Sequence, residues 1–339
     1  MTRIVLCLSH AIEEHDQLRL LTSIGHEVFS IGGYIDPQHP HDPKRPPLDI
    51  PYYPELHAAI DAIGSDDNLG AAQTYLPDAI LDWADVLIYH HNLGRLYGQW
   101  DRIRDWRTGS RRVIWRTVGQ SVEANERDAH GFRADGLEIV RYSPKERNIP
   151  GYAGEDAVIR FWKDPDEWGG WTGDDPTVVQ FVQNFRARYE WCNRAYFEAA
   201  TEGLPHRVYG PQSDELLYGG GQLSLPEMQS VLRRSRAYLY TGTQPASYTL
   251  GLIEAMMTGI PVVSIGPSHM TIFAYGPDLF EGSEIAGGGW DNPTDARDAL
   301  RRLLDDPDRA ARQSQGQRAH AITLFGRETI ARQWAEYLA

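Results

Sequence analysis

Lysine is nearly absent from this chain of 339 residues, which holds three lysines and thirty arginines. The lysines are Lys44, Lys145 and Lys163, so no lysine follows position 163. An anion-binding site in the second half of the chain must therefore rely on arginine side chains and backbone amides. The formal net charge of −14 argues against non-specific binding to nucleic acid or anionic lipid, which needs a positive field. A local basic groove is compatible with that total.

Cysteine and long apolar runs are also scarce. Cys7 and Cys192 are the only cysteines, and they lie far apart in segments expected to be core. We therefore expect reduced thiols of a cytoplasmic protein, with neither a disulfide framework nor zinc-ligand spacing. No run of 18 apolar residues exists, so no transmembrane helix is predicted. The first apolar run, of about five residues, is too short for a signal peptide and fits a buried strand.

The length of the chain suits two domains with ample cores. In the first half, strand-like apolar segments alternate with amphipathic helical ones, which predicts a parallel sheet with crossover helices. The expected strands cover residues 3–9, 26–33, 84–92, 111–119, 136–143 and 155–161.

Residues 162–177 are dense in Gly, Pro and Asp and read as an interdomain linker. A second series of strands and helices begins at residue 178. The proline-rich loop over residues 34–55 has no periodicity, and loops of that length are often functional. A rigid surface crossing is the alternative interpretation of that loop.

The most informative segment covers residues 244–266. Its pattern predicts a loop, a helix that begins at Thr249 to Leu250 and ends at Gly259, and then a buried strand. A helix N-terminus at a sheet edge binds anions because its first amides have no internal partner. Glu254 lies among apolar neighbours in this helix, and burying a carboxylate is unfavourable unless something hydrogen-bonds to it. Together these features suggest a site for a phosphate and a hydroxyl-rich group, such as a nucleotide ribose.

The same segment resembles the donor-binding motif of the retaining family 4 glycosyltransferases. The matching residues are Pro245, Leu250, Glu254, Ala255, Met256, Gly259, Pro261, Val262 and Val263. Residues 206–243 and 291–319 resemble the segments that flank this motif in the family. The C-terminal half is therefore a specific match, and the N-terminal half is a weak one.

The resemblance implies an α/β protein with the GT-B fold, in which two Rossmann-like doubly wound domains face each other across a cleft. The acceptor-side domain would cover residues 1–170, and the nucleotide-sugar-binding domain would cover 171–320. A final helix over 321–339 would cross back to the first domain.

The resemblance also implies which residues contact the donor. Glu254 would hold the ribose, the amides of Thr249 and Leu250 would bind phosphate, and Ser247 or Tyr248 could supply further hydrogen bonds. The family has an Arg and a Lys on the diphosphate at an earlier loop. The corresponding candidates here are Arg186 and Arg188, which could grip phosphate oxygens bidentately or be merely solvated surface residues.

Three further candidates follow predicted strands. Gly210 could let the backbone approach a nucleotide, or it could mark an ordinary turn. Arg116 stands near the position of a family histidine and could stabilise the leaving phosphate. His91 could orient the acceptor, with a structural histidine as the alternative.

Two departures from the family leave rival interpretations open. The usual Glu eight residues before Glu254 is Ala246, and the first strand is not followed by a Gly-rich loop. A non-catalytic GT-B module that binds a sugar or nucleotide would explain both departures. A DNA-base glycosyltransferase is a variant of the main interpretation, whereas the features of a GT-B epimerase or phosphorylase are not evident.

We therefore expect a cytoplasmic, metal-independent, retaining glycosyltransferase without a cofactor. Its donor substrate would be a nucleotide-diphosphate sugar. Its acceptor would be a hydroxyl of a small molecule, a glycan or a modified DNA base.

Overall fold

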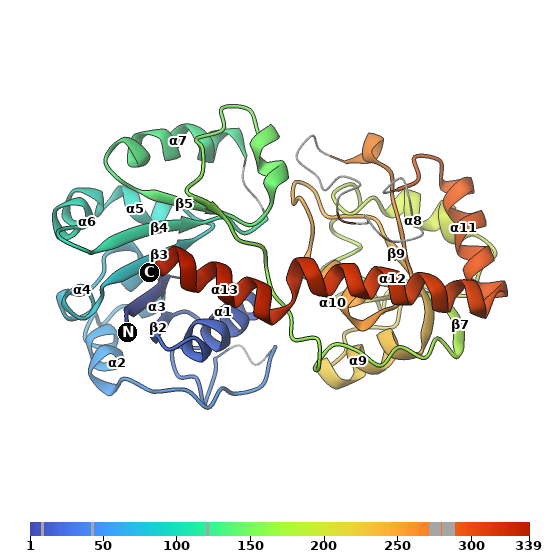
Figure 1. Ribbon diagram of the computed structural model, residues 1–339, viewed down its shortest axis with the longest axis horizontal. Coiled ribbons are helices and arrows are strands. Elements are labelled where there is room, and N and C mark those ends of the chain that lie inside the picture. Colours follow the sequence, from blue (N-terminus) through green and yellow to red (C-terminus); the bar gives the residue numbers. More distant parts are fainter. Residues whose placement is uncertain (8–9, 42–43, 120–121, 271–278, 280–288) are drawn as a thin grey trace. The chain divides into compact units, whose positions relative to one another are not determined.

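The computed structural model describes residues 1–7, 10–41, 44–119, 122–270, 279 and 289–339. The chain divides into two compact units (Figure 1). The first contains Met1–Arg160 together with Ile330–Ala339, and the second contains Phe161–Thr329. Among the described helices, none combines the length and apolar character that crossing a membrane requires.

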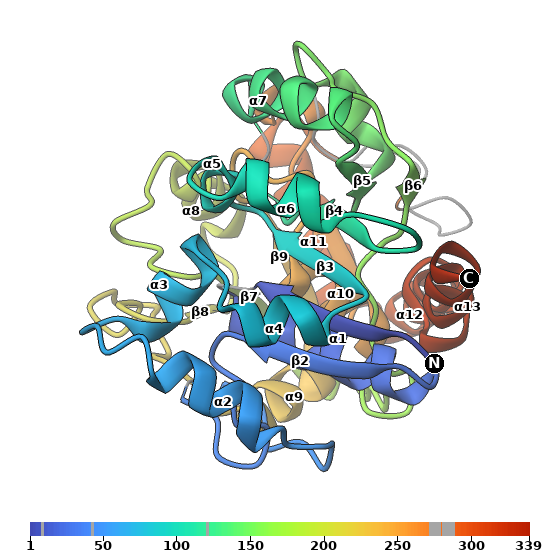
Figure 2. The ribbon, with the colours of Figure 1, turned by 90° about the vertical axis from the view of Figure 1, so that its left-hand side faces the viewer.

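The first unit is built on a parallel sheet with the strand order β2-β1-β3-β4-β5-β6 (Figure 2). The carboxyl ends of neighbouring strands lie side by side, as the pairing of His90 with Arg116 shows. The strands are β1 (Arg3–Cys7), β2 (Glu27–Ile31), β3 (Val86–His90), β4 (Arg112–Arg116), β5 (Glu138–Arg141) and β6 (Ala157–Val158).

Helices connect these strands and bury their apolar sides against the sheet. One face of the sheet, which includes Leu87 and Trp115, packs in a single core with helical residues such as Ile60 and Ile103. The helical elements are α1 (Ala11–Ser23), α2 (Pro54–Asp61), α3 (Asn68–Thr74), α4 (Asp78–Trp83), α5 (Gly94–Tyr97), α6 (Trp100–Trp106), α7 (Glu123–Ala134) and the 3-10 helix η1 (Pro144–Asn148).

The C-terminal helix α13 (Arg327–Leu338) packs on the first unit through its last turns. The Tyr337 hydroxyl donates to the Glu138 carboxylate at 2.6 Å, and the Arg112 guanidinium donates to the Tyr337 carbonyl at 2.8 Å. The Trp334 ring lies 5.7 Å from the Arg116 guanidinium carbon. These contacts explain why the end of the chain clusters with a sheet whose strands precede it by nearly the whole sequence.

The second unit has a four-stranded parallel sheet with the order β10-β9-β7-β8. Its strands are β7 (Asp175–Phe181), β8 (His206–Tyr209), β9 (Ser235–Tyr240) and β10 (Val262–Ser264). The chain passes from β7 to β8 on one side and then returns to place β9 on the other side of β7. Such a reversal of strand order is where open α/β sheets bind their ligands, outside the carboxyl ends of the strands.

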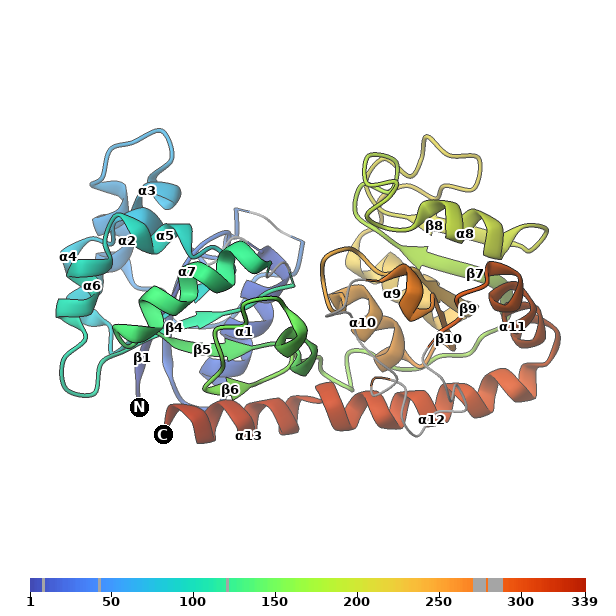
Figure 3. The same ribbon diagram turned by 90° about the horizontal axis from the view of Figure 1, so that it is seen from above.

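The helices of the second unit cover both faces of this sheet. Residues of α8 and α11 share a core with β7, β8 and β9. Helix α12 runs beside α10 and continues into α13 after Gly326 (Figure 3). The helical elements are α8 (Arg194–Thr201), α9 (Leu225–Arg234), α10 (Leu250–Thr258), η2 (Pro267–His269), α11 (Pro293–Asp305) and α12 (Pro307–Phe325).

Two glutamines of α12 satisfy backbone groups around strand β10. Gln317 accepts from the Val262 amide and donates to the Ile260 carbonyl, each at 3.0 Å, and Gln313 donates to the Val262 carbonyl at 3.0 Å. These side chains take the place of a further strand, because unpaired backbone groups would be costly to bury.

The predicted α/β fold class is confirmed by the two parallel sheets. The units divide at residue 160, so residues 161–170, which the sequence assigns to the end of the first domain, cluster with the second unit. Contacts described below, above all those of Lys163 and Arg318, hold that segment there.

Candidate functional site

Helix α10 begins where the sequence predicts. Thr249 is its N-cap, and the Thr249 hydroxyl accepts from the Leu252 amide at 3.3 Å. Gly259, with φ of +95°, ends the helix in the left-handed conformation. The amides of Leu250 and Gly251 have no partner inside the helix, which is the property that makes a helix N-terminus bind anions.

The start of α10 lies over the carboxyl end of β7. A methyl group built on Gly251 would lie 3.7 Å from the Tyr238 hydroxyl and 3.9 Å from the Phe181 carbonyl oxygen. Burial raises the pKa of Tyr240, while hydrogen bonds with Thr249 oppose that rise. The helix N-terminus therefore opens at the point where the strand order reverses.

The loops that follow β7 and β9 contact each other at this edge of the sheet. Trp191 accepts through its carbonyl from the Gln244 amide at 2.7 Å. The Asn193 side chain donates to the Thr241 carbonyl at 2.8 Å, and the Thr241 hydroxyl donates to the Cys192 carbonyl at 2.6 Å. These bonds join the loop between β9 and α10 to the loop after β7, which carries Arg186 and Arg188.

Gly210 lies at the same edge, directly after β8. Its φ of +131° is a conformation that side chains rarely adopt, and a methyl group there would lie 2.0 Å from the Val182 carbonyl oxygen. The backbones after β7 and β8 approach closely at this point, so only glycine fits. The sequence left open whether Gly210 lets the backbone approach a nucleotide or marks an ordinary turn, and contact with a nucleotide stays a prediction.

Arg186 and Arg188 follow β7 as predicted, but their surroundings differ. Arg186 is exposed and forms an ion pair with Glu215 from the loop after β8. Arg188 is half-buried, and its backbone carbonyl accepts from the Cys192 amide at 3.0 Å. No ion pair of Arg188 is found in the part of the chain that the structure describes. Glu215 is thus a carboxylate that a phosphate would displace from Arg186.

Ser247 and Tyr248 are buried rather than open to solvent. Ser247 has no exposed surface, and Tyr248 is 1% exposed. The Tyr248 ring packs against Phe161 and Phe325, at centroid distances of 5.9 and 5.6 Å. Both aromatic partners belong to the second unit. Tyr248 therefore packs the loop before α10 against the segment before β7 and the end of α12.

Glu254 is 4% exposed and pairs with a residue that the sequence analysis assigned no role. The Nζ of Lys163 lies 2.7 Å from the Glu254 Oε1, and the side chain of Lys163 is 2% exposed. The compensating group that a buried carboxylate requires is therefore a lysine from the segment preceding β7. The scarcity of lysine was the available signal, because Lys163 is one of three lysines in the chain and lies within the predicted linker.

Arg116 and His91 belong to the first unit. Arg116 ends β4 with no exposed surface, and its guanidinium donates to the carbonyls of Arg141, at 3.1 Å, and Ile159. The predicted stabilisation of a leaving phosphate by Arg116 is not tested by these contacts and stays a prediction.

His91 follows β3 with φ of +65°, a conformation uncommon for a residue other than glycine. Its amide donates to the Arg116 carbonyl at 2.9 Å, and its carbonyl accepts from the Trp115 indole at 3.2 Å. Burial lowers the pKa of His91. The predicted role of His91 in orienting the acceptor is not tested by these contacts and stays a prediction.

Within the second unit, the structure gathers three of the predicted residues at one edge of the sheet. Gly210, Thr249 and Leu250 lie at the carboxyl edge of the second sheet. Glu254 lies further along α10 in its buried pair. His91 and Arg116 lie at the carboxyl edge of the other sheet, on β3 and β4.

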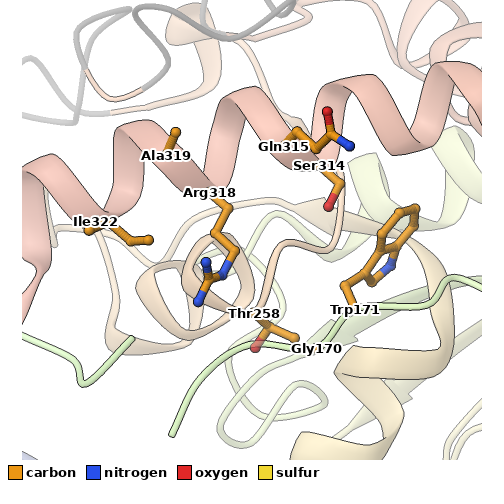
Figure 4. Close-up of a pocket in the computed structure, with 8 residues that line it drawn as sticks. All are labelled: Gly170, Trp171, Thr258, Ser314, Gln315, Arg318, Ala319 and Ile322. Atoms are coloured by element: carbon orange, nitrogen blue, oxygen red, sulfur yellow. The ribbon is translucent and has the colours of Figure 1, made fainter. Parts of the chain in front are cut away.

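A separate hollow of about 470 Å³ lies near the opposite end of α10 (Figure 4). None of the predicted site residues lines it. The lining residues are Gly170, Trp171, Thr258, Ser314, Gln315, Arg318, Ala319 and Ile322. The hollow lies away from the helix N-terminus, where the unbonded amides of α10 are.

Within the described residues, no three His, Cys, Asp or Glu side chains are grouped so that they could hold a metal ion.

Comparison with known proteins adds a family and a fold. Residues 186–339 match the family model described as glycosyl transferase-like. No curated protein shows significant similarity to the chain.

Among solved structures, HepE from Anabaena in complex with UDP-glucose has a TM-score of 0.67 at 14% identity, covering 100% of this chain and 99% of HepE. A glycosyltransferase from Rickettsia africae also has a TM-score of 0.67, at 11% identity, covering 99% and 97%. Staphylococcal (S. aureus) TarM has a TM-score of 0.59 at 15% identity, over 80% of this chain and 58% of TarM.

This chain therefore spans well under two thirds of the length of TarM, whereas it matches the other two structures almost end to end. At these identities the structural likeness establishes the fold. The expected GT-B fold is confirmed, and the expected relation to glycosyltransferases is confirmed as a match of residues 186–339 to the glycosyl transferase-like family model.

Proposed function

We propose that this protein is a retaining, metal-independent glycosyltransferase that moves a sugar from a nucleotide-diphosphate donor to an acceptor hydroxyl. One observation carries the proposal. The N-terminus of α10, capped by Thr249, opens over the carboxyl end of β7 where the strand order reverses, inside the glycosyl transferase-like domain. That position combines unpartnered amides with the usual ligand site of a doubly wound sheet.

Catalysis would consist mainly of stabilising the diphosphate as it departs. The amides of Leu250 and Gly251 supply fixed donors that need no reorganisation as negative charge develops. Arg186 and Arg188 would add cationic donors from the loop after β7. Arg186 would exchange Glu215 for a phosphate, and an exposed ion pair of this kind contributes only about 0–1 kcal/mol, so the exchange costs little.

Glu254 would accept hydrogen bonds from the ribose hydroxyls. An ionised carboxylate has about four acceptor positions, so it can accept from more than one donor at a time. Retention would follow if the acceptor attacks on the face that the diphosphate leaves, with a phosphate oxygen taking the acceptor proton. We propose His91 and Arg116 as the residues of the first unit that serve the acceptor and the leaving group.

UDP-glucose is the first donor to test, because HepE has been solved with it. A donor that binds only the folded protein raises its stability by about 2.7 kcal/mol at a concentration of 100 Kd. We expect at least one nucleotide-sugar in a thermal-shift panel to raise Tm, and the same donor to release nucleoside diphosphate slowly in water. No rise in Tm with any common nucleotide-sugar would overturn the proposal.

A non-catalytic binding module is the second candidate, and Ala246 favours it, because family members usually carry a carboxylate there. The same panel separates the two. A donor that raises Tm and is never cleaved, even with a wide range of hydroxyl acceptors present, indicates the binding module.

A further inference from the structure

We propose that Lys163 is a positioning residue for the donor, because it holds Glu254 ionised and oriented toward the ribose. This inference rests on the proposed function and adds a residue that the glycosyl transferase-like model does not include, since that match begins at residue 186. It also gives a role to Lys163, which is the one lysine in the sequence of the second unit.

The pair is nearly closed to solvent. The Nζ of Lys163 and the Oε1 of Glu254 are 2.7 Å apart, and their side chains are 2% and 5% exposed. A carboxylate buried to this extent without a cation would take up a proton, because desolvation disfavours its charged form. A protonated Glu254 would lose most of its capacity to accept hydrogen bonds from a diol.

The backbone of Lys163 is fixed, so its side chain reaches Glu254 from a set direction. The Lys163 amide donates to the Phe325 carbonyl at 2.9 Å, and Lys163 pairs with Gly326 in an isolated parallel bridge. The Nζ also lies 5.6 Å from the centroid of the Trp168 ring, which is 2% exposed. A cation over an indole face is favourable and restricts where the ammonium can move.

The segment that carries Lys163 is fastened to α10 itself. The guanidinium of Arg318, from α12, donates to the Met257 carbonyl at 2.9 Å and to the Pro165 carbonyl at 2.8 Å. Met257 is near the end of α10, and Pro165 is two residues beyond Lys163. Arg318 therefore provides a second connection that keeps the segment of Lys163 close to α10.

Titratable groups from two other elements act on Glu254 within the described part of the chain. From the segment before β7 comes Lys163, and from β9 comes Tyr238, whose pKa is raised by burial with a contribution from the charge of Glu254. Arg318 on α12 is directed to carbonyl groups, as described above. Lys163 forms a buried ion pair with Glu254, so its removal should change the protonation of that carboxylate.

The test uses calorimetric titration of the full chain with UDP-glucose between about pH 5.5 and pH 8.5. UDP-glucose suits this purpose because its diphosphate has no proton that titrates in this range. We expect the wild type to bind with an affinity that changes little with pH. Lys163→Met should bind roughly tenfold or more weakly at low pH and recover affinity as the pH rises, because Glu254 is then ionised only at higher pH.

Two further variants separate positioning from a structural role. Glu254→Gln should bind weakly at every pH, and Lys163→Met in the Glu254→Gln background should bind no more weakly than Glu254→Gln alone. Lys163→Arg keeps the charge, so it should retain a flat pH profile even with a reduced affinity. Lys145→Met, a matched change in the first unit, should behave as the wild type.

The outcomes are distinguishable. If Lys163→Met binds UDP-glucose with the wild-type pH profile, or more weakly with a flat profile, Lys163 does not position Glu254 and the inference is wrong. If Lys163→Met does not fold, a sloping pH profile in Lys163→Arg or additive losses in the double variant would overturn it equally. Failure of the wild type to bind UDP-glucose, GDP-mannose or ADP-glucose would overturn the proposed function, and the inference with it.

Discussion

At the scale of single residues, the pairing of Lys163 with Glu254 changes what the loss of either side chain should do. From the sequence alone, Glu254 is a ribose contact whose buried partner is not identified. In the structure it is 4% exposed and compensates a buried ammonium. A substitution must therefore affect stability as well as binding.

We predict that Glu254→Gln lowers the free energy of unfolding by about 3–5 kcal/mol, because it leaves Lys163 buried without an anion. Urea unfolding measures this loss. Adding Lys163→Met should restore most of it, since an apolar side chain needs no partner. The single variant should also weaken UDP-glucose binding by roughly 1–3 kcal/mol. Wild-type stability in Glu254→Gln would contradict the buried pair.

Glu215 offers a second prediction at this scale. Because its carboxylate pairs with Arg186, Glu215→Gln should free the guanidinium for a phosphate and tighten UDP-glucose binding modestly, by about 0–1 kcal/mol. The pair is exposed, so the gain should shrink at high salt. Replacement of both Arg186 and Arg188 by Ala should remove the effect of Glu215→Gln. Weaker binding in Glu215→Gln would show that Arg186 does not reach the donor.

At the scale of elements, sequence patterns predicted the parts of the site that depend on local geometry. The start of α10 at Thr249 and its end at Gly259 follow from capping and glycine signals a few residues long, and Gly210 was expected only as a turn or a close approach to a ligand. The partner of Glu254 could not be predicted in this way. It comes from a segment far away in sequence, and no periodicity links a linker lysine to a helix that begins at Leu250.

The turn at Gly210 allows a direct test of this local geometry. Gly210→Ala should destabilise the protein by more than about 1–3 kcal/mol, because a strained φ of +131° is combined with a contact of 2.0 Å to the Val182 carbonyl. Gly203→Ala is the matched control, with φ of +75° and no atom within 4 Å of the added methyl group. The control should lose only about 1–2 kcal/mol. Equal losses in thermal unfolding would contradict the close backbone approach after β8.

At the scale of the whole molecule, alternation of strands and helices was sufficient to predict two parallel α/β sheets. The division of the chain was harder to predict, because residues 161–170 resemble a linker in composition yet are bound to α10 and α12 by Lys163 and Arg318. Long-range side-chain contacts, rather than composition, decide to which unit such a segment belongs.

Buried histidines of the first unit should make the whole protein sensitive to acid. The pKa of His90 is lowered well below its ordinary value, first by burial and then by Arg116, and burial lowers the pKa of His91. The unfolded chain therefore binds protons that the folded chain does not. Stability should be fully present above about pH 6.5 and fall as the pH decreases toward the folded pKa values.

Urea unfolding at about pH 7.5 and about pH 5.5 checks this dependence. His90→Gln should lose less stability between these two values than the wild type, whatever its stability at the higher pH. The same difference in both proteins would show that His90 does not contribute.

The release of nucleoside diphosphate from nucleotide-sugars tests the central claim, that the edge around the start of α10 is the donor site of an enzyme. The wild type should release nucleoside diphosphate from at least one donor, with UDP-glucose first in the panel. Replacement of Arg186 and Arg188 by Ala should abolish that release without altering Tm. A wild type that releases nothing from any common nucleotide-sugar, in water or with hydroxyl acceptors present, would contradict the account.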